Sequence, residues 1–416
     1  MYVCSKEITH EEAIALGCDP NLRSNYRSRP DGLVEVDMKG NVIWEWNISD
    51  HVIQDVNPDV ANYVGKGKKI ADYPQKFDAN FGAGRRGDWI HTNSFDYNEV
   101  LDQVVINNSW GNEFYVVDHG GTFVPGDPKK SIELAASDAG DFLFRWGNPV
   151  NYDAGDPPSV KHDGETISHG HKQLFFTHDI QWIREKEVMP MKWELPGAGN
   201  FLIFDNGGRR LDTSYSSVIE INPYKGDWRK GVYVPEAEAG YAPTRGKAPQ
   251  QISRQITWSF KSTTPHSFYG SYISGCQRLP NGNTFIASGP QGHFFEVTKA
   301  GEVVWEYINP VGDRTGDKYG IYKIMSDEVG EEFNATFRAH RYPADYAGLT
   351  GRDLKPLGKI TEIHSVNPSM EPVRPQGPYT AGKGSDPRVY DASKPPAKGK
   401  GAKGKGPKGK GPKKGK

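Results

Sequence analysis

The sequence is poor in cysteine and has no long apolar run. Its 416 residues include three cysteines, Cys4, Cys18 and Cys276. An odd count does not make a disulfide framework. Cys4 and Cys18 could pair in an oxidising compartment, but free buried thiols are the favoured interpretation. No stretch of about 20 apolar residues occurs, which is the length that a membrane-spanning helix needs.

The familiar catalytic motifs are also missing. The chain has no phosphate loop, no GxSxG elbow and no HExxH helix, which argues against an NTPase, an α/β-hydrolase and a zinc peptidase. His169 and His171 are close enough in sequence to bind a metal, but no cysteine or second histidine pair completes a tetrahedral set. We therefore expect no metal and no cofactor. The first seventeen residues lack the basic and apolar segments of a signal peptide.

Glycine, proline and aromatic residues are abundant instead. The 48 glycines, 30 prolines and 12% aromatic content favour short strands joined by tight turns. Charge is unevenly distributed, because residues 394–416 contain ten lysines and no acid, which leaves a net charge of −11 on residues 1–393. We predict that residues 371–416 form a disordered basic tail. Contact with a polyanion or membrane surface, and a merely solubilising role, both stay open.

One sequence pattern occurs twice. Residues 33–46 read LVEVDMKGNVIWEW and residues 294–307 read FFEVTKAGEVVWEY. Both place Glu-Val before a glycine turn and Trp-Glu-aromatic after it. Gly40 and Gly301 supply the turn, and apolar residues alternate on either side. The two segments are therefore predicted to be copies of one β-hairpin.

The second copy extends into a unit of four antiparallel strands. Phe268–Leu279 and Thr284–Ser288 precede its hairpin, so the unit has the length of one β-propeller blade. Two more such units are predicted within residues 88–147 and 174–260. The N-terminal unit has only three strands. Either Ile360–His364 supplies the missing strand or the chain is truncated, which is the favoured alternative. We predict an all-β propeller over residues 1–370.

Histidines and arginines recur where such blades would meet. His91 and His178 both fall in the first, innermost strand of a unit, so both are expected to face the central axis. A single histidine in a strand is usually structural, whereas two at matching positions favour a shared site. Arg209 and Arg210 follow an Asp-Asn-Gly-Gly turn and suit the binding of an oxyanion. His293 follows a glycine-rich turn.

Four runs carry a resemblance to a known family. DWIHTNSFDYN, FFTHDIQW with NFLIFDNGGRR, SSVIEINP, and SGCQRLPNGNTFIASGPQGHFFEVTKAGEVVWEYINP resemble the arylsulfate sulfotransferases over roughly residues 30–350. The resemblance implies a six-bladed β-propeller and transfer of a sulfuryl group from a phenolic sulfate ester to another phenol. It implies no nucleotide sulfate donor and a periplasmic or secreted location. The partners expected are aryl sulfates and phenols, and no nucleic acid is expected on the folded domain.

The resemblance also implies an arginine and three histidines in the site. His91, His178 and Arg210 match the family's positions, with Arg209 as the alternative arginine. His293 falls where the nucleophile is expected, and His266 is the alternative. His293 would form a sulfohistidine, Arg210 would neutralise the sulfuryl oxygens, and His178 or His91 would protonate the leaving phenolate.

Three aromatic residues are candidates to stack on the aryl group. They are Trp89, Trp182 and Tyr269, and packing between blades is the alternative role for each. Other functions also stay open at this stage. A non-catalytic propeller could bind an anionic glycan or protein, and a sulfatase-like hydrolase would use water in place of phenol. A quinoprotein dehydrogenase would need a calcium site of Glu, Asn and Asp that the sequence does not display.

Overall fold

The structure is a computed structural model. It describes residues 1–21, 28–80, 87–160, 167–184, 195–245, 249–264, 267–309, 311–313, 319–321, 335–344 and 346–356. The predicted tail, the candidate closing strand Ile360–His364 and the alternative histidine His266 lie outside these residues.

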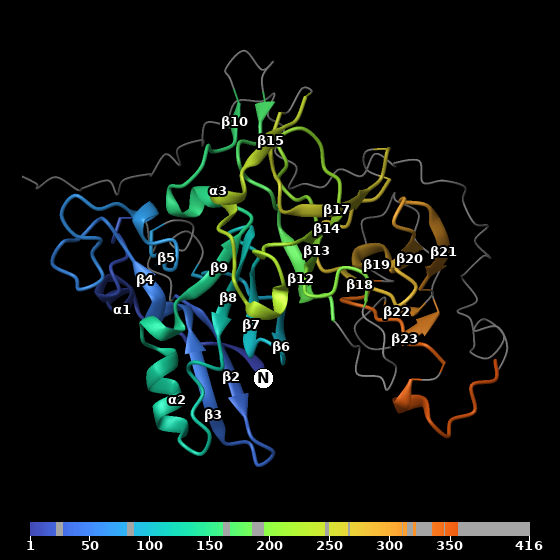
Figure 1. Cartoon of the computed structure of the whole chain (residues 1–416), viewed down its shortest axis with the longest axis horizontal. Coiled ribbons are helices and arrows are strands. Elements are labelled where there is room, and N and C mark those ends of the chain that lie inside the picture. The colour runs from blue at the N-terminus through green and yellow to red at the C-terminus, as the bar shows by residue number, and fades with distance from the viewer. Residues whose placement is uncertain are drawn as a thin grey trace, which may run out of the picture.

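Four antiparallel sheets follow one another along the chain (Figure 1). The first sheet has three strands, β1 (Tyr2–Ser5), β2 (Asp31–Val36) and β3 (Val42–Asn47). The second contains β6 (Phe95–Asn98), β7 (Gln103–Asn108), β8 (Glu113–Asp118) and β9 (Phe142–Trp146). The third contains β12 (Thr177–Trp182), β13 (Phe201–Asp205), β14 (Ser217–Ile221) and β17 (Ile256–Lys261), and the fourth β18 (Gly275–Arg278), β19 (Thr284–Ser288), β20 (His293–Val297) and β21 (Val303–Ile308).

The remaining elements are short and lie around these sheets. The helices are α1 (His10–Ala15), α2 (Pro128–Ala135) and α3 (Glu236–Ala239). Two-stranded pairs join β4 (Val52–Ile53) with β5 (Phe77–Asp78), β10 (Ser159–Val160) with β11 (Ile167–Ser168), β15 (Tyr241–Pro243) with β16 (Gln251–Ser253), and β22 (Val311–Asp313) with β23 (Tyr319–Ile321). No helix in the described ranges is long and apolar enough to cross a membrane.

The four sheets share one irregularity, which confirms that they are copies of a single unit. In each sheet the register shifts where its last two strands pair. The shifts fall at Glu35/Val36, Val116/Val117, Glu220/Ile221 and Glu296/Val297. A β-bulge bends a strand and increases its twist. Because the register shift recurs at the same place, all four sheets have a similar local bend. Two of these shifts lie in the hairpins that the sequence pattern identified.

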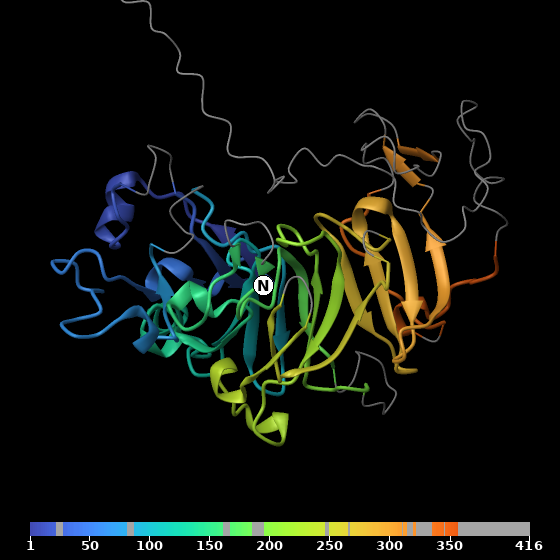
Figure 2. The same ribbon diagram turned by 90° about the horizontal axis from the view of Figure 1, so that it is seen from above.

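The hydrophobic core lies between successive sheets. One apolar cluster joins the first and second sheets, another joins the second and third, and a third joins the third and fourth. The ring of Phe114 from β8 lies 4.9 Å from that of Phe201 from β13. Figure 2 shows the sheets side by side, from blue through teal and green to orange. Each sheet therefore covers the apolar face of its neighbour, as stacked repeats must.

Aspartates on the inner side tie each sheet to the next. In every case a carboxylate oxygen accepts from a backbone N–H of the following unit. The pairs are Asp31 with Thr92 at 2.7 Å, Asp96 with Trp182 at 3.0 Å and Asp179 with Cys276 at 2.9 Å. Burial raises the pKa of Asp96 to about 6, against the opposing effect of Arg184. These carboxylates lose contact with water when the protein folds, and their hydrogen bonds to the next sheet offset that loss. The same bonds fix the distance between neighbouring sheets.

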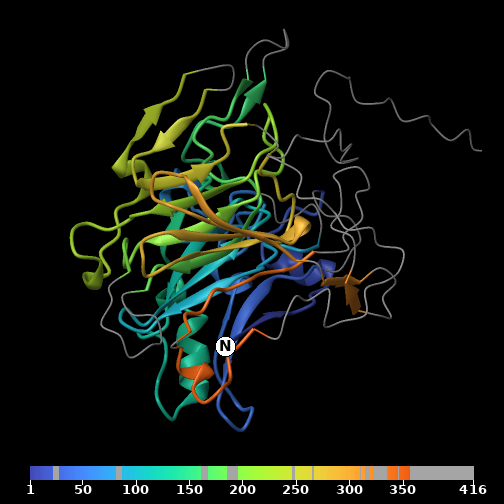
Figure 3. The ribbon, with the colours of Figure 1, turned by 90° about the vertical axis from the view of Figure 1, so that its right-hand side faces the viewer.

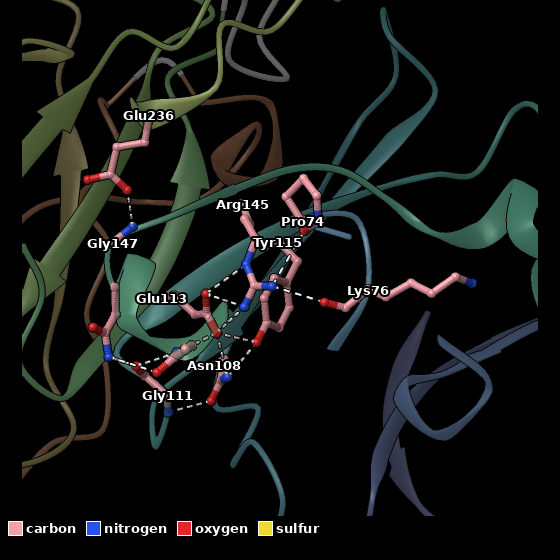
Figure 4. A network of polar contacts seen from close by, with 11 residues as sticks. Pro74, Lys76, Asn108, Gly111, Glu113, Tyr115, Arg145, Gly147 and Glu236 are labelled. Atoms are coloured by element: carbon pink, nitrogen blue, oxygen red, sulfur yellow. Dashed lines mark hydrogen bonds and ion pairs between the residues drawn. The ribbon is translucent and has the colours of Figure 1, made fainter. Parts of the chain in front are cut away.

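A buried ion pair anchors the second sheet (Figure 4). Nη2 of Arg145 lies 2.7 Å from Oε2 of Glu113, and both side chains are almost fully buried. The hydroxyl of Tyr115 and the amide of Asn151 also donate to Glu113. Asn151 donates in addition to the carbonyl oxygen of Gly111. The network therefore fixes the turn between β7 and β8.

The segment 335–344 continues the pattern beyond the fourth sheet, which faces the viewer in Figure 3. Nε2 of Gln181 donates to the carbonyl oxygen of Cys276, which joins the third sheet to the fourth. In the same way Nε2 of Gln277 donates to the carbonyl oxygen of Arg341. The segment thus contacts the fourth sheet much as the fourth sheet contacts the third. The described residues do not form a closed ring, so closure and blade number stay predictions.

The predicted first strands are longer than the observed ones. Sequence reasoning extended them over residues 88–97, 174–183 and 268–279, whereas β6, β12 and β18 are confined to the C-terminal part of each. The backbone leaves the extended region just before the strands, at His91 (φ 52°), Phe176 (φ 62°) and Ser274 (φ 93°). Such conformations cannot be read from apolar alternation. All three cysteines are free in the structure.

Candidate active site

His91 lies in the turn before β6 and not in the strand itself. Its Nδ1 is 2.7 Å from Oδ2 of Asp88, and 44% of its side chain is exposed. The hydrogen bond from Asp88 raises the pKa of His91 above its ordinary value of 6.5, although partial burial opposes this. Oδ2 of Asp88 also accepts from Nε1 of Trp110 at 3.0 Å. Asp88 therefore holds a histidine that is readily protonated beside an aromatic ring.

His178 is the second residue of β12 and is 4% exposed. Its Nδ1 lies 2.7 Å from Oδ1 of Asn206. The other end of that amide donates to the carbonyl oxygens of Gly270 and Ile273, at 2.7 and 2.9 Å. These bonds fix which atom of Asn206 faces the imidazole, so Nδ1 of His178 must be the donor. Its Nε2 is then unprotonated.

Burial keeps His178 neutral. Desolvation lowers the pKa of His178 to about 4, and the positive charges of His91 and Arg338 contribute to this. The imidazole therefore offers a free electron pair on Nε2 at neutral pH. His91 and His178 differ in the direction of their pKa shifts, which is the arrangement expected where one group acts as an acid and the other as a base or nucleophile.

A row of aromatic rings connects the two histidines. The ring of Trp110 lies 5.1 Å from that of His91 and 5.3 Å from that of Phe176. Phe176 lies 5.7 Å from His178. Phe337 packs against His178 at 6.2 Å. The structure thus brings His91 and His178 together beside an aromatic surface, which is suited to an aryl ligand.

Two arginines accompany these rings. The guanidinium of Arg209 lies 5.6 Å from the centre of the Trp110 ring. Nε of Arg338 is 3.0 Å from Oδ1 of Asp179, and Nη2 of Arg338 contacts the carbonyl oxygen of Asn93. Arg338 and Asp179 also line a cavity of about 770 Å³ together with residues of β6, β12 and β18, and the two histidines are not among its lining residues. Both guanidiniums can meet an anion that approaches the histidines.

Sequence reasoning missed Arg338, Phe337 and Trp110. Phe337 and Arg338 belong to the segment 335–344, which has none of the strand alternation that marks the four sheets. Trp110 lies in the turn between β7 and β8, and no motif marks it in the sequence.

Arg210 lies apart from this arrangement. Its Nη2 is 2.5 Å from Oδ2 of the buried Asp205, and its guanidinium lies 4.1 Å from each of the rings of Phe175 and Tyr215. These contacts enclose Arg210 in the third sheet. Arg209, the alternative arginine of the sequence analysis, is the one that extends over the aromatic rings.

The contacts described for His293 stay within the fourth sheet. It is the first residue of β20, and its Nε2 lies 2.7 Å from Oε1 of Glu306 on β21. Its ring lies 4.9 Å from that of Phe295. Burial lowers the pKa of His293, and Glu306 opposes this. These contacts do not include His91 or His178, so the role of His293 as the nucleophile stays a prediction.

The three aromatic candidates differ in position. Trp89 is 1% exposed and packs 6.0 Å from Phe77. Trp182 is equally buried, and its Nε1 donates to the hydroxyl of Tyr224 at 2.9 Å. Both are core residues in this structure. Tyr269 is half-buried, and its carbonyl oxygen accepts from Gln291.

Strained backbone gathers at the candidate site. Nine residues other than glycine have a positive φ in the described ranges. Seven of them contact the site residues or precede the first strands of the sheets, namely His91, Asn112, Phe176, Asp179, Arg209, Ile273 and Ser274. Such conformations persist where the surrounding structure imposes them, and they gather at functional sites.

The described residues contain no group of three or more His, Cys, Asp or Glu side chains that could hold a metal ion. His169 and His171 bind different partners. Nε2 of His169 lies 3.0 Å from Asp212, and Nδ1 of His171 accepts from the backbone N–H of Asp156 at 2.9 Å.

Comparison with known proteins confirms the family resemblance over one segment. Residues 9–109 match the family model described as arylsulfotransferase (ASST). The match includes His91 and ends before His178. No curated protein matches the chain.

Likenesses to solved structures are weak. A protein of unknown function from Bacteroides caccae aligns with 67% of this chain at 9% identity and a TM-score of 0.27. This chain spans about half of its length, 54%. Virginiamycin B lyase from Staphylococcus aureus aligns over 53% of this chain and 71% of its own, at 12% identity and a TM-score of 0.18. Neither likeness carries an argument about fold or function.

Proposed function

We propose that the protein transfers a sulfuryl group from an aryl sulfate ester to a phenol, with His178 as the nucleophile. The observation that carries the proposal is the neutral imidazole of His178, whose Nδ1 is bonded to Asn206 and whose Nε2 is left with a free electron pair. The match to the arylsulfotransferase family supports the reaction class. The role differs from the sequence-based expectation, which gave it to His293.

The first half-reaction forms a sulfohistidine. Nε2 of His178 attacks sulfur while the bond between sulfur and the aryl oxygen breaks. The electron pair of that bond goes to the oxygen, and protonated His91 supplies the proton that makes it a phenol. Sulfuryl transfer resembles phosphoryl transfer, in which charge spreads over three oxygens and catalysis is mainly positioning and electrostatics. Arg209 and Arg338 supply the compensating charge.

The second half-reaction reverses these steps with the acceptor. The hydroxyl oxygen of an acceptor phenol attacks sulfur, and neutral His91 takes its proton. The bond between sulfur and nitrogen breaks, and its electron pair returns to Nε2 of His178. The cycle needs no nucleotide sulfate donor. The raised pKa of His91 suits a group that holds a proton near neutral pH and releases it in turn.

The test is release of nitrophenolate from 4-nitrophenyl sulfate, with and without phenol. We expect phenol-dependent release by the wild type and its loss in His178→Ala, with a sulfuryl adduct on the His178 peptide before phenol is added. His10→Ala, on the remote helix α1, is the matched control. Loss in His293→Ala with an active His178→Ala would overturn the assignment. Release without phenol would indicate a hydrolase, and no release from folded protein a binding module.

The family resemblance also suggests where the protein works and how the chain is divided. We propose a periplasmic or secreted location, and one propeller domain of six blades over residues 1–370 followed by a basic tail. Limited proteolysis that leaves a stable core ending near residue 370 is the expected result. Cleavage into two stable cores within residues 1–370 would contradict a single domain.

A further inference from the structure

A second, smaller cavity lies behind Trp110. It has a volume of about 260 Å³, and Trp110, Asn148, Val150, Pro158 and Lys172 are among its lining residues. The ring of Trp110 also contacts His91 and Phe176. The tryptophan is therefore a wall shared by this cavity and the candidate active site. A ligand that reached from one to the other would pass the edge of this ring.

Lys172, which is half-buried, brings a positive charge to the cavity. Its Nζ lies 4.6 Å from the centre of the Phe175 ring, and it forms no ion pair with a carboxylate in the described part of the chain. Burial lowers the pKa of Lys172 to about 8; the charge of Asp205 opposes this, and the like charges of Arg210 and Arg209 add to it. A lysine placed so is costly unless a ligand or water accepts a hydrogen bond from it.

Asn148 contributes an acceptor. Its Nδ2 donates to the carbonyl oxygen of Gly111 and to Oδ1 of Asn151, both at 2.9 Å. These bonds fix the orientation of the amide. Oδ1 of Asn148 is buried and has no hydrogen-bond partner. A buried acceptor without a partner also calls for a group that can donate to it.

These features define one kind of ligand. A hydroxyl group both accepts and donates, so it can satisfy Lys172 and Asn148 together. The ring of Trp110 offers an aromatic surface beside them. The volume is below the range of about 300–1,000 Å³ typical of sites for drug-sized ligands, so the cavity suits the end of one ring and not a fused polycycle.

We propose that this cavity binds a phenolic hydroxyl, so that the enzyme favours aryl substrates carrying a second hydroxyl remote from the reacting oxygen. The proposal rests on the proposed function, because it takes the candidate active site to hold an aryl group. It adds the class of substrate, namely dihydroxyaryl compounds, and it assigns specificity to Lys172 and Asn148.

The test is binding of benzene-1,4-diol, phenol and benzenesulfonate to the full chain by calorimetry. We expect the diol to bind about 10-fold more tightly than phenol, the order expected for one hydrogen bond to a charged group. Lys172→Met should remove that preference, and Lys39→Met, in the exposed turn of the first sheet, should retain it. Equal binding of diol and phenol by the wild type would overturn the proposal. Tightest binding of benzenesulfonate would make the cavity an anion site and overturn it as well.

A second variant protects the test against misfolding. Val150→Phe fills the cavity without changing any charge, so it should also remove the diol preference. Binding does not depend on sulfuryl transfer. A diol preference without sulfuryl transfer would therefore contradict the proposed reaction and support the cavity assignment. Sulfuryl transfer without a diol preference would support the reaction and contradict the cavity assignment. If folded Lys172→Met and Val150→Phe both kept the diol preference, the second hydroxyl of the diol would have to bind outside this cavity.

Discussion

Oδ1 of Asn206 accepts a hydrogen bond from Nδ1 of His178 at 2.7 Å, and Asn206 cannot present its other end, because that end is bonded to two carbonyl oxygens. A single amide therefore decides the tautomer of the histidine that we assign as the nucleophile. An aspartate in its place would favour an imidazolium. An amide brings no charge, so burial can keep His178 neutral, and the hydrogen bond to Asn206 leaves its Nε2 available.

The first prediction concerns pH. Because His178 must be neutral, kcat/KM for the sulfate donor should rise as pH increases through about 4. Because His91 must be protonated, kcat/KM should fall again at pH values above the pKa of His91, which is raised above 6.5. The measurement is a pH profile of nitrophenolate release at saturating phenol. His91→Gln should lower the rate and abolish the alkaline fall. An unchanged alkaline fall in that variant would assign the acid to another group.

Arg338 should matter for the rate and little for stability when its charge is kept. Arg338→Lys retains a cation opposite Asp179 but loses the planar fork that suits a sulfuryl group. We expect a fall in kcat of about 10²-fold, the lower end for loss of an oxyanion donor. Arg341→Lys, three residues along the same segment, is the matched control and should keep its activity. Equal losses in the two variants would indicate a role in packing the segment.

The neighbouring arginines of the third sheet should behave differently from one another. Arg210→Met leaves Asp205 buried without its partner, so it should cost about 3–5 kcal/mol in the free energy of unfolding. Arg209→Met removes an exposed side chain, so stability should change by less than about 0.5 kcal/mol while activity falls. Denaturant titration and the transfer assay separate the two effects. A stable but inactive Arg210→Met variant would indicate that Arg210 belongs to the active site.

Glu236 should make the protein less stable as the pH rises. It lies in α3, accepts from the backbone N–H of Gly147 at 3.0 Å (Figure 4), and burial raises its pKa to about 8. The folded state therefore keeps Glu236 protonated at pH values above 4.5, the ordinary pKa of the group. The free energy of unfolding should fall as the pH rises from 4.5 to about 8, by up to about 5 kcal/mol. Glu236→Gln should flatten the dependence in urea titrations, and exposed Glu238→Gln should not. Parallel curves for wild type and Glu236→Gln would contradict this.

The repeated sheets could be predicted because their information is local. The pattern shared by residues 33–46 and 294–307 fixes a hairpin, and β8 and β19 fall where alternation and turn residues place them. The first strands were overextended, since residues such as His91 and Phe176 adopt positive φ under tertiary constraint. Closure of the ring depends on contacts between distant segments, and no local pattern specifies them.

The candidate site was predictable only in part. Matching strand positions brought His91 and His178 to attention, and the structure places them together. The choice between Arg209 and Arg210 could not be made from sequence, because it depends on which guanidinium reaches Asp205. Arg338 was missed, since the segment 335–344 contains no strand and so lacks the alternating pattern that marks the four sheets.

The segment that carries Arg338 has a consequence for how the protein matures. Arg338 and Asn93 are in contact although 245 residues separate them in the chain. Contacts of such long range form late, because they close a large loop. During synthesis the first three sheets can pack while the ribosome is still adding the rest. A nascent chain would then display both histidines before it acquires Arg338, and it would gain catalytic competence in a single late step.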